Sequence, residues 1–117
     1  MTKRLAFQNL VNDAKSRINE CSMEHINKMI YNNVLDGTLL DIRELHEHER
    51  GYIYNSVHIS RGVLESKIET LIPDKSQKIY LYCAGGYRSA LSADNLMKMG
   101  YKNVYSIAGG YQAWQII

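Results

Sequence analysis

The chain has 117 residues, of which 45% are hydrophobic and 22% are charged, and its formal net charge is +2. This length suits one domain with a single hydrophobic core, and the composition is that of an ordinary globular protein. The small net charge, with no run rich in Lys or Arg, argues against nucleic-acid binding. No apolar stretch is long enough to span a membrane, and the first residues lack the apolar core of a signal peptide, so we expect a cytoplasmic protein.

An amphipathic helix is expected near the start of the chain. Its apolar positions recur at intervals of three and four residues, as on one face of a helix: Phe7, Leu10, Val11, Ala14 and Ile18. We expect this helix to pack back on the domain, and the alternative is a dimerisation or docking arm. The sequence therefore divides into residues 1–20, an N-terminal helix with a lead-in strand, and residues 21–117, the main domain.

Strands and helices are expected to alternate through the main domain. The expected strands are residues 18–21, 39–42, a short segment around His58, 78–82 and 104–107. Helices are expected after Ser22 as N-cap, after Arg61 with Leu64, Ile68, Leu71 and Ile72 on the apolar face, from Ser89 to Met99, and around Trp114. Because hairpin signals are absent, this alternation predicts an α/β fold with a central, mostly parallel sheet of about five strands and helices on both faces.

The segment from Glu44 to Arg50 is the only cluster with the appearance of a metal site. His46 and His48 are two residues apart, so on a helix their side chains point in different directions. No further ligand pattern accompanies them, and we interpret the segment as a solvated helical turn without a metal. His58, on its own short strand, is interpreted as a hydrogen-bonded structural histidine.

The segment from Leu81 to Ala90 carries the strongest functional signal. An apolar strand delivers Cys83 to its end, Gly85–Gly86 and Arg88 follow, and a helix is expected from Ser89. Glycines allow backbone N–H groups to turn toward the sulfur, and the first turn of a helix leaves further N–H groups unpaired. These groups and Arg88 favour a thiolate, the nucleophilic form of cysteine. A buried structural cysteine is the alternative, but it needs neither the glycine pair nor the arginine, so we favour a reactive Cys83.

Cys21 has no glycine or base nearby in the sequence. We interpret it as structural, and the alternative is a second, resolving thiol. In a reducing cytosol, both cysteines are expected to be free thiols.

Four motifs resemble those of the rhodanese (thiosulfate sulfurtransferase) family and stand in that family's order. They are Leu39–Glu44 (Leu-Leu-Asp-Ile-Arg-Glu), Gly51–Gly62, the loop Cys83–Ser89 and Gly109–Trp114 (Gly-Gly-Tyr-Gln-Ala-Trp). The resemblance covers roughly residue 21 to the C-terminus and implies a rhodanese-like domain over 21–117. Tyr52 stands where the family usually has histidine and Ser60 where it usually has proline, differences that alter a turn rather than the cysteine loop.

The resemblance implies sulfur transfer with Cys83 as the catalytic nucleophile. Cys83 would take the outer sulfur of thiosulfate or another persulfide donor and pass it to cyanide or a thiol, without a cofactor. Arg88 would attract the anionic donor or brace the loop against a carboxylate, Tyr87 would shape the pocket mouth, and Ser89 would cap the helix. Backbone N–H groups of the loop would hold the transferred sulfur, so the expected substrate-binding residues are Ala84, Gly85, Gly86, Tyr87 and Arg88.

Two other functions remain open. One is a persulfide carrier that serves a partner protein in a sulfur relay without turnover of its own, with the N-terminal helix as the docking element. The other is a cysteine phosphatase or arsenate reductase. The phosphatase signature has five residues between cysteine and arginine, whereas four residues, Ala84 to Tyr87, separate Cys83 from Arg88 here. The shorter loop makes a cup that suits one sulfur atom better than a tetrahedral phosphate.

Overall fold

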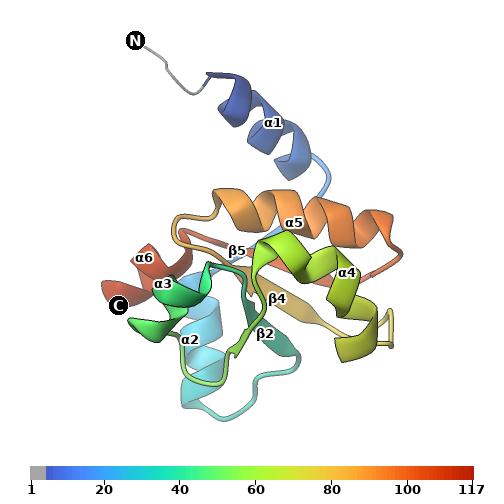
Figure 1. Ribbon diagram of the computed structural model, residues 1–117. Coiled ribbons are helices and arrows are strands. Elements are labelled where there is room, and N and C mark those ends of the chain that lie inside the picture. The colour runs from blue at the N-terminus through green and yellow to red at the C-terminus, as the bar shows by residue number, and fades with distance from the viewer. Residues whose placement is uncertain (1–4) are drawn as a thin grey trace.

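The computed structural model describes residues 5–117, and its centre is a sheet of five parallel strands (Figure 1). The strands are β1 (Asn19–Ser22), β2 (Thr38–Asp41), β3 (Val57–His58), β4 (Ile79–Tyr82) and β5 (Val104–Ala108), in the order β1-β5-β4-β2-β3. All four residues of the central strand β4 are buried, as its continuous apolar run indicates for a strand covered on both faces. The predicted parallel sheet is confirmed.

Helices cover both faces of this sheet, which confirms the predicted fold class. The helices are α1 (Leu5–Lys15), α2 (Met23–Tyr31), α3 (Leu45–Glu49), α4 (Arg61–Leu71), α5 (Tyr87–Lys98) and α6 (Gly110–Gln115). Side chains of α4 and α5 share one apolar core with Leu40 and Leu81 of the sheet. Side chains of α2 and α6 share a second core with Leu39 and Tyr80, which point to the opposite face.

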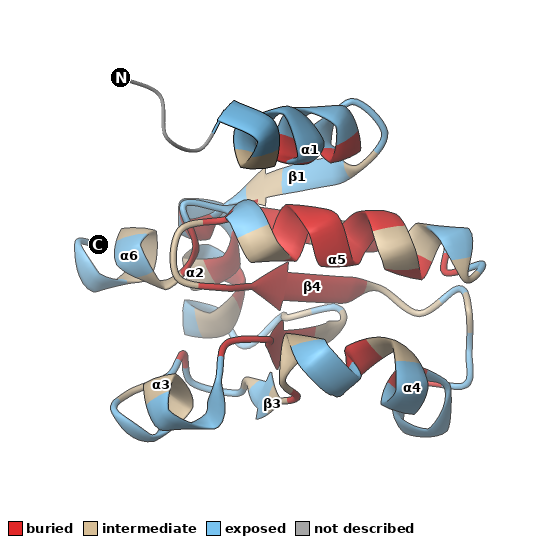
Figure 2. Ribbon diagram, turned by 45° about the horizontal axis from the view of Figure 1, so that its top comes forward, coloured by how far each residue is buried: buried red, intermediate tan, exposed pale blue. Residues whose placement is uncertain are grey.

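The helix α1 forms a further layer on the outer side of α5 (Figure 2). Val11 and Ala14 pack against Ala90 and Leu91, and this cover leaves most of α5 buried. Leu10, expected on the same face, is 56% exposed. That expectation was wrong because α1 packs on a single helix, so its buried stripe is narrower than the apolar spacing suggested. Residues 1–4 of the predicted N-terminal unit lie outside the described residues, and its boundary at residue 20 stays a prediction.

Details of the helix ends confirm one expectation and correct two. The N–H of His25 donates to Ser22 Oγ at 3.1 Å, so Ser22 is the N-cap of α2. Leu71 was expected in the core but is 45% exposed. The chain leaves helical geometry after Leu71, and Ile72, at 3% exposed, takes the buried position instead. The helix α5 begins at Tyr87, two residues before the expected start.

No helix among residues 5–117 is long and apolar enough to cross a bilayer.

Candidate active site

Cys83 follows the last residue of β4, at the edge of the sheet where all the parallel strands have their carboxyl ends. Loops at this edge form the binding sites of many open α/β sheets. The Cys83 side chain is buried, yet it borders a pocket of about 340 Å³ whose other walls come from α1, the loop, the start of α5 and α6. The pocket is lined by Phe7, Cys83, Ala84, Gly85, Tyr87, Arg88 and Gln112.

Two backbone N–H groups donate to the Cys83 sulfur. The N–H of Gly86 lies 3.1 Å from Sγ and that of Ser89 lies 3.4 Å from it. The Cys83 thiol also lies 3.6 Å from Ser89 Oγ, which in turn is 2.8 Å from Ser106 Oγ. Gly86 can present its N–H because it adopts φ 98°, a left-handed conformation that favours glycine. The thiol donates to Ser89 Oγ, whereas the N–H groups of Gly86 and Ser89 donate to the sulfur and favour negative charge on it.

These contacts place the predicted site residues in two groups. Within the described chain, Gly86 is the member of the expected set 84–88 whose N–H reaches Sγ, while Ala84, Gly85, Tyr87 and Arg88 line the pocket. Substrate binding by this set stays a prediction. The expectation that Ser89 caps the helix was wrong, because Gly86 occupies the N-cap position of α5. Ser89 is instead buried in the first turn, with both its N–H and its hydroxyl beside the sulfur.

The start of α6 fixes the other side of the cysteine loop. The N–H of Tyr111 donates to the Cys83 carbonyl at 2.8 Å, and that of Gln112 donates to the Ala84 carbonyl at 3.0 Å. A Cβ atom at Gly110 would collide with the same Cys83 carbonyl, so glycine is required for this close approach. From the sequence, Gly109–Gly110 was identified only as the start of the motif Gly109–Trp114. The structure shows that it also supports the loop that holds the sulfur.

Arg88 is held by a carboxylate from α3. Its two terminal nitrogens donate to Glu47 Oε1 at 3.0 Å and Oε2 at 3.2 Å. The hydrogen bond raises the pKa of Arg88 and lowers that of Glu47. Arg88 was expected either to attract the anionic donor or to hold the loop by pairing with a carboxylate. The ion pair with Glu47 corresponds to the second role. The interpretation of Glu44–Arg50 as a solvated helical turn is confirmed, since α3 has no buried residue. The sequence did not predict that Glu47 and His48 of this turn also bond to Arg88 and Asp41.

A buried ion pair anchors α3 to the end of β2. Arg43 donates to Asp41 through Nε at 2.9 Å and Nη2 at 2.7 Å, and His48 Nδ1 lies 2.8 Å from Asp41 Oδ2. Burial alone would raise the pKa of Asp41, but these hydrogen bonds lower it overall. His58 Nε2 contacts the Arg43 carbonyl at 2.7 Å, as expected for a structural histidine.

Among residues 5–117, no three His, Cys, Asp or Glu side chains are grouped so that they could hold a metal ion.

Cys21 lies in a different environment. It belongs to the edge strand β1, separated from β4 by β5, and packs against the core on the α2 face, whereas Cys83 belongs to the core on the α5 face. Burial, with the charge of Glu20 beside it, raises the pKa of Cys21 to about 11. The thiol therefore stays protonated near neutral pH and is a poor nucleophile. This argues against the alternative of Cys21 as a resolving thiol.

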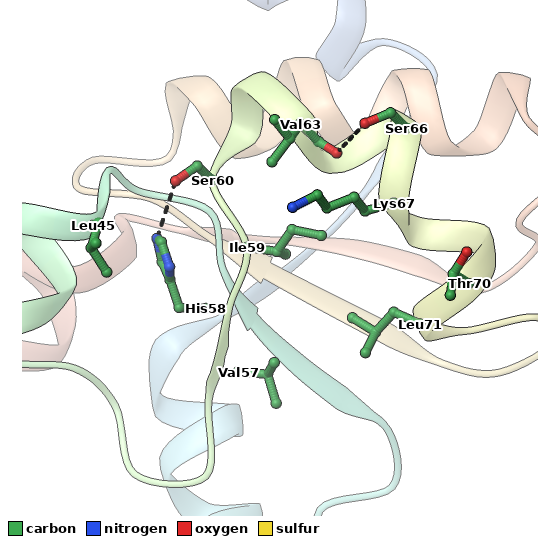
Figure 3. Close-up of a pocket in the computed structure, with 10 residues that line it drawn as sticks. All are labelled: Leu45, Val57, His58, Ile59, Ser60, Val63, Ser66, Lys67, Thr70 and Leu71. Atoms are coloured by element: carbon green, nitrogen blue, oxygen red, sulfur yellow. Dashed lines mark hydrogen bonds between the residues drawn. The ribbon is translucent and has the colours of Figure 1, made fainter.

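A larger pocket of about 780 Å³ lies between β3 and α4 (Figure 3). Val57, Ile59 and Leu71 are among its apolar lining residues, and Ser60 and Lys67 are among its polar ones. No cysteine lines this pocket. Among the described residues, Cys83 lines the smaller pocket instead.

Known proteins with similar sequences and structures contain the same domain. A family model described as "Rhodanese-like domain" matches residues 22–116. The thiosulfate sulfurtransferase GlpE of Coxiella burnetii is 32% identical over 80 residues, which cover 68% of this chain and 73% of that protein. The putative sulfur carrier protein YrkF of Bacillus subtilis is 34% identical over 76 residues, which cover 65% of this chain and 40% of that protein.

Among solved structures, a protein of unknown function from Rhodopseudomonas palustris, described as a possible tyrosine phosphatase, superimposes with a TM-score of 0.87. It is 32% identical, and the match covers 94% of this chain and 89% of that one. The family model spans the sheet from the end of β1 through α6, including the Cys83 loop and the Gly110 turn that supports it. The chain belongs to the rhodanese-like domain family.

Proposed function

We propose that this protein is a sulfurtransferase that carries a sulfane sulfur on Cys83. The Cys83 thiolate attacks the outer sulfur of a donor R–S⁻, in which R is the sulfonate group of thiosulfate or an equivalent leaving group. The bond between that sulfur and R breaks, R leaves with the electron pair, and the enzyme holds Cys83–S–S⁻. With thiosulfate the leaving group is sulfite, and the charge balances at each step.

The observation that carries the proposal is the pair of N–H groups aimed at Cys83 Sγ from Gly86 and Ser89, at 3.1 and 3.4 Å. A persulfide adds one sulfur beyond Sγ, with its negative charge on the outer atom. Amide donors fixed beforehand around the sulfur stabilise that charge without rearranging, by the logic of an oxyanion hole. The fixed Cys83 and Ala84 carbonyls and the Arg88–Glu47 pair keep the loop in this shape.

In the second half of the reaction, an acceptor thiolate or cyanide attacks the outer sulfur and regenerates the Cys83 thiolate. The covalent intermediate predicts ping-pong kinetics. Both halves are displacements at sulfur, which depend on the thiolate and on the leaving group, so the proposal requires no metal or cofactor. We propose the cytoplasm as the compartment, because a reducing environment keeps Cys83 as a free thiol.

Three proteins test this proposal: wild type, Cys83→Ser and Cys21→Ser. Each is incubated with thiosulfate and weighed by intact mass spectrometry, and cyanide is then added to measure thiocyanate. Wild type and Cys21→Ser are expected to gain one sulfur atom and to form thiocyanate, and Cys83→Ser neither. Loading that survives in Cys83→Ser would contradict the proposal.

A persulfide carrier is the second candidate, and the similarity to the putative sulfur carrier YrkF favours it. This chain spans less than half of that longer protein, so a carrier role is proposed for the domain alone. A carrier would accept sulfur from a partner cysteine desulfurase while turning over thiosulfate negligibly. Phosphatase chemistry, suggested by the Rhodopseudomonas palustris neighbour, is disfavoured because Arg88 is engaged by Glu47 rather than directed at a phosphate. Hydrolysis of an aryl phosphate without thiocyanate formation would support it.

A further inference from the structure

We propose that the sulfur donor is an organic one, a persulfide or thiosulfonate whose sulfane sulfur is attached to an apolar or aromatic group, and that Phe7 of α1 selects it. This inference rests on the proposed sulfur transfer at Cys83 and adds the substrate class. It draws on two features of the same pocket: an aromatic wall supplied by the N-terminal helix, and the neutralised charge of the loop arginine.

The aromatic wall joins α1 to the cysteine loop. The rings of Phe7 and Tyr87 meet edge to face, with centroids 6.1 Å apart and planes at 77°. Both side chains line the pocket that Cys83 borders. Val11 and Ala14 hold α1 on α5, so Phe7 is presented from a packed helix. The match to the family model begins at residue 22, so this wall comes from a part of the chain outside the matched region.

The charge of the pocket disfavours a small dianion such as thiosulfate. Arg88 has the only charged side chain among the described residues that line it, and both of its terminal nitrogens are bound to Glu47. The cation is therefore already paired with a carboxylate. Among the described lining residues, a dianion that enters finds no other charged side chain, so backbone N–H groups must replace most of its lost hydration. A donor with one negative charge, spread over the reacting sulfur, meets a smaller penalty.

The size of the pocket agrees with such a donor. Its volume of about 340 Å³ lies at the lower end of the range of about 300–1,000 Å³ that small-molecule sites occupy. The organic group would lie against Phe7 and Tyr87 while its sulfane sulfur reaches Cys83. For an aromatic thiosulfonate, the Cys83 thiolate takes that sulfur, the sulfur–sulfur bond breaks, and an aromatic sulfinate leaves with the electron pair.

The test compares two donors that differ in their organic group and charge, benzenethiosulfonate and thiosulfate, with cyanide as the common acceptor. The proteins are wild type, Phe7→Ala, Phe7→Leu and the control Leu10→Ala, all with Cys21→Ser. Leu10 lies on the same helix but is exposed and does not line the pocket. In a ping-pong reaction, kcat/KM for each donor reports the loading of Cys83 alone. Thermal unfolding verifies that α1 remains folded, and Phe7→Leu keeps the apolar bulk should Phe7→Ala loosen the helix.

We expect wild type to prefer benzenethiosulfonate, and Phe7→Ala to lower the ratio of the two kcat/KM values about tenfold. Phe7→Leu should lower it less, and Leu10→Ala should leave it unchanged. If Phe7→Ala changes both donors equally, or neither, the inference is overturned while sulfur transfer at Cys83 stands.

A second measurement does not depend on turnover. Cys83 is modified with benzyl methanethiosulfonate and with methyl methanethiosulfonate, which attach a benzylthio or a methylthio group and release the same sulfinate. The benzyl-to-methyl rate ratio should exceed that of unfolded protein in wild type and fall in Phe7→Ala. If no donor loads wild type, the proposed function fails, and this ratio still decides whether Phe7 forms an aromatic subsite. An equal ratio in wild type and Phe7→Ala would overturn that assignment.

Discussion

Cys83 and Cys21 are the same side chain in two contrasting environments of one sheet. Cys83 lies beyond the end of the central strand, beside the N–H groups of Gly86 and Ser89. Cys21 lies within an edge strand, on the opposite face, where burial and Glu20 disfavour its thiolate. Burial alone does not distinguish them, since Cys83 is the more buried of the two. The difference is that two backbone N–H groups point at the Cys83 sulfur, whereas Cys21 lies beside the charge of Glu20.

Gly110→Ala should produce the largest change in the difference in reactivity between Cys83 and Cys21. A Cβ atom there would collide with the Cys83 carbonyl, and Gly110 also has φ 53°. We expect a loss of about a hundredfold or more in the loading of Cys83, because a displacement near 1 Å in a reacting group has that effect. We also expect a stability loss of about 1–3 kcal/mol from the strained backbone. The reactivity of Cys21 should not change.

Gly62→Ala is the matched control for this substitution. Gly62 lies in the first turn of α4, and a Cβ atom there would meet no atom within 4 Å. Loading of Cys83 and thermal unfolding are measured for both variants. Normal loading in folded Gly110→Ala would show that the loop does not depend on the support of α6.

The second-largest effect is expected in the pH dependence of Cys21 alkylation. In Cys83→Ser, Cys21 is the remaining thiol, and its pKa of about 11 means that its thiolate fraction rises with pH over the range studied. The rate with iodoacetamide should rise about tenfold per pH unit, or about a hundredfold between pH 7 and 9. In denaturant the same thiol should approach the ordinary pKa of about 8.5, and its rate should level off above that pH. A plateau near pH 8.5 in the folded protein would contradict the raised pKa.

Ser89→Ala should have a moderate effect. The substitution removes the hydroxyl to which the Cys83 thiol donates at 3.6 Å and which can donate in turn to the thiolate, but it keeps the backbone N–H at 3.4 Å. The kcat/KM for sulfur loading should fall about threefold to tenfold, as for one lost hydrogen bond. Ser92→Ala is the control, because Ser92 is buried on the same helix and its hydroxyl has no partner among the described residues. Equal losses in the two variants would indicate a packing effect and not a contact with the sulfur.

Glu47→Gln should have the smallest effect and the opposite sign. The substitution removes the negative charge beside Arg88, while a glutamine carbonyl can still accept the N–H of Glu44 as Glu47 Oε1 does at 2.9 Å. A less neutralised Arg88 should raise kcat/KM for thiosulfate about threefold, an effect that salt reduces. Glu49→Gln, an exposed position on the same helix, should change nothing. A fall in thiosulfate use by Glu47→Gln would mean that bracing the loop outweighs freeing the charge.

The strands of the sheet could be predicted from the sequence because local patterns of apolar residues mark them. The run Ile79–Tyr82 is apolar throughout and becomes the buried centre of the sheet. The left-handed conformation of Gly86 likewise follows the expectation that glycine turns an N–H toward the sulfur. Both features depend on residues next to each other in the chain, where period and glycine placement are directly visible.

The contacts that could not be predicted from the sequence join residues far apart in the chain. Glu47 and Arg88 are separated by 41 positions, and the collision that requires glycine at Gly110 involves the Cys83 carbonyl. Neither pairing leaves a periodic signal. The second Gly-Gly pair was nevertheless a usable clue, since one glycine suffices for a turn and a second suggests close approach of another backbone segment.

The most direct test of the account uses both cysteines within one wild-type molecule. The protein is loaded with a sulfane sulfur donor, digested without reductant, and the peptides that contain Cys21 and Cys83 are compared by tandem mass spectrometry. The account predicts one additional sulfur atom on the Cys83 peptide and an unmodified Cys21 peptide. Additional sulfur on Cys21, or none on Cys83 after exposure to both thiosulfate and an aromatic thiosulfonate, would contradict it.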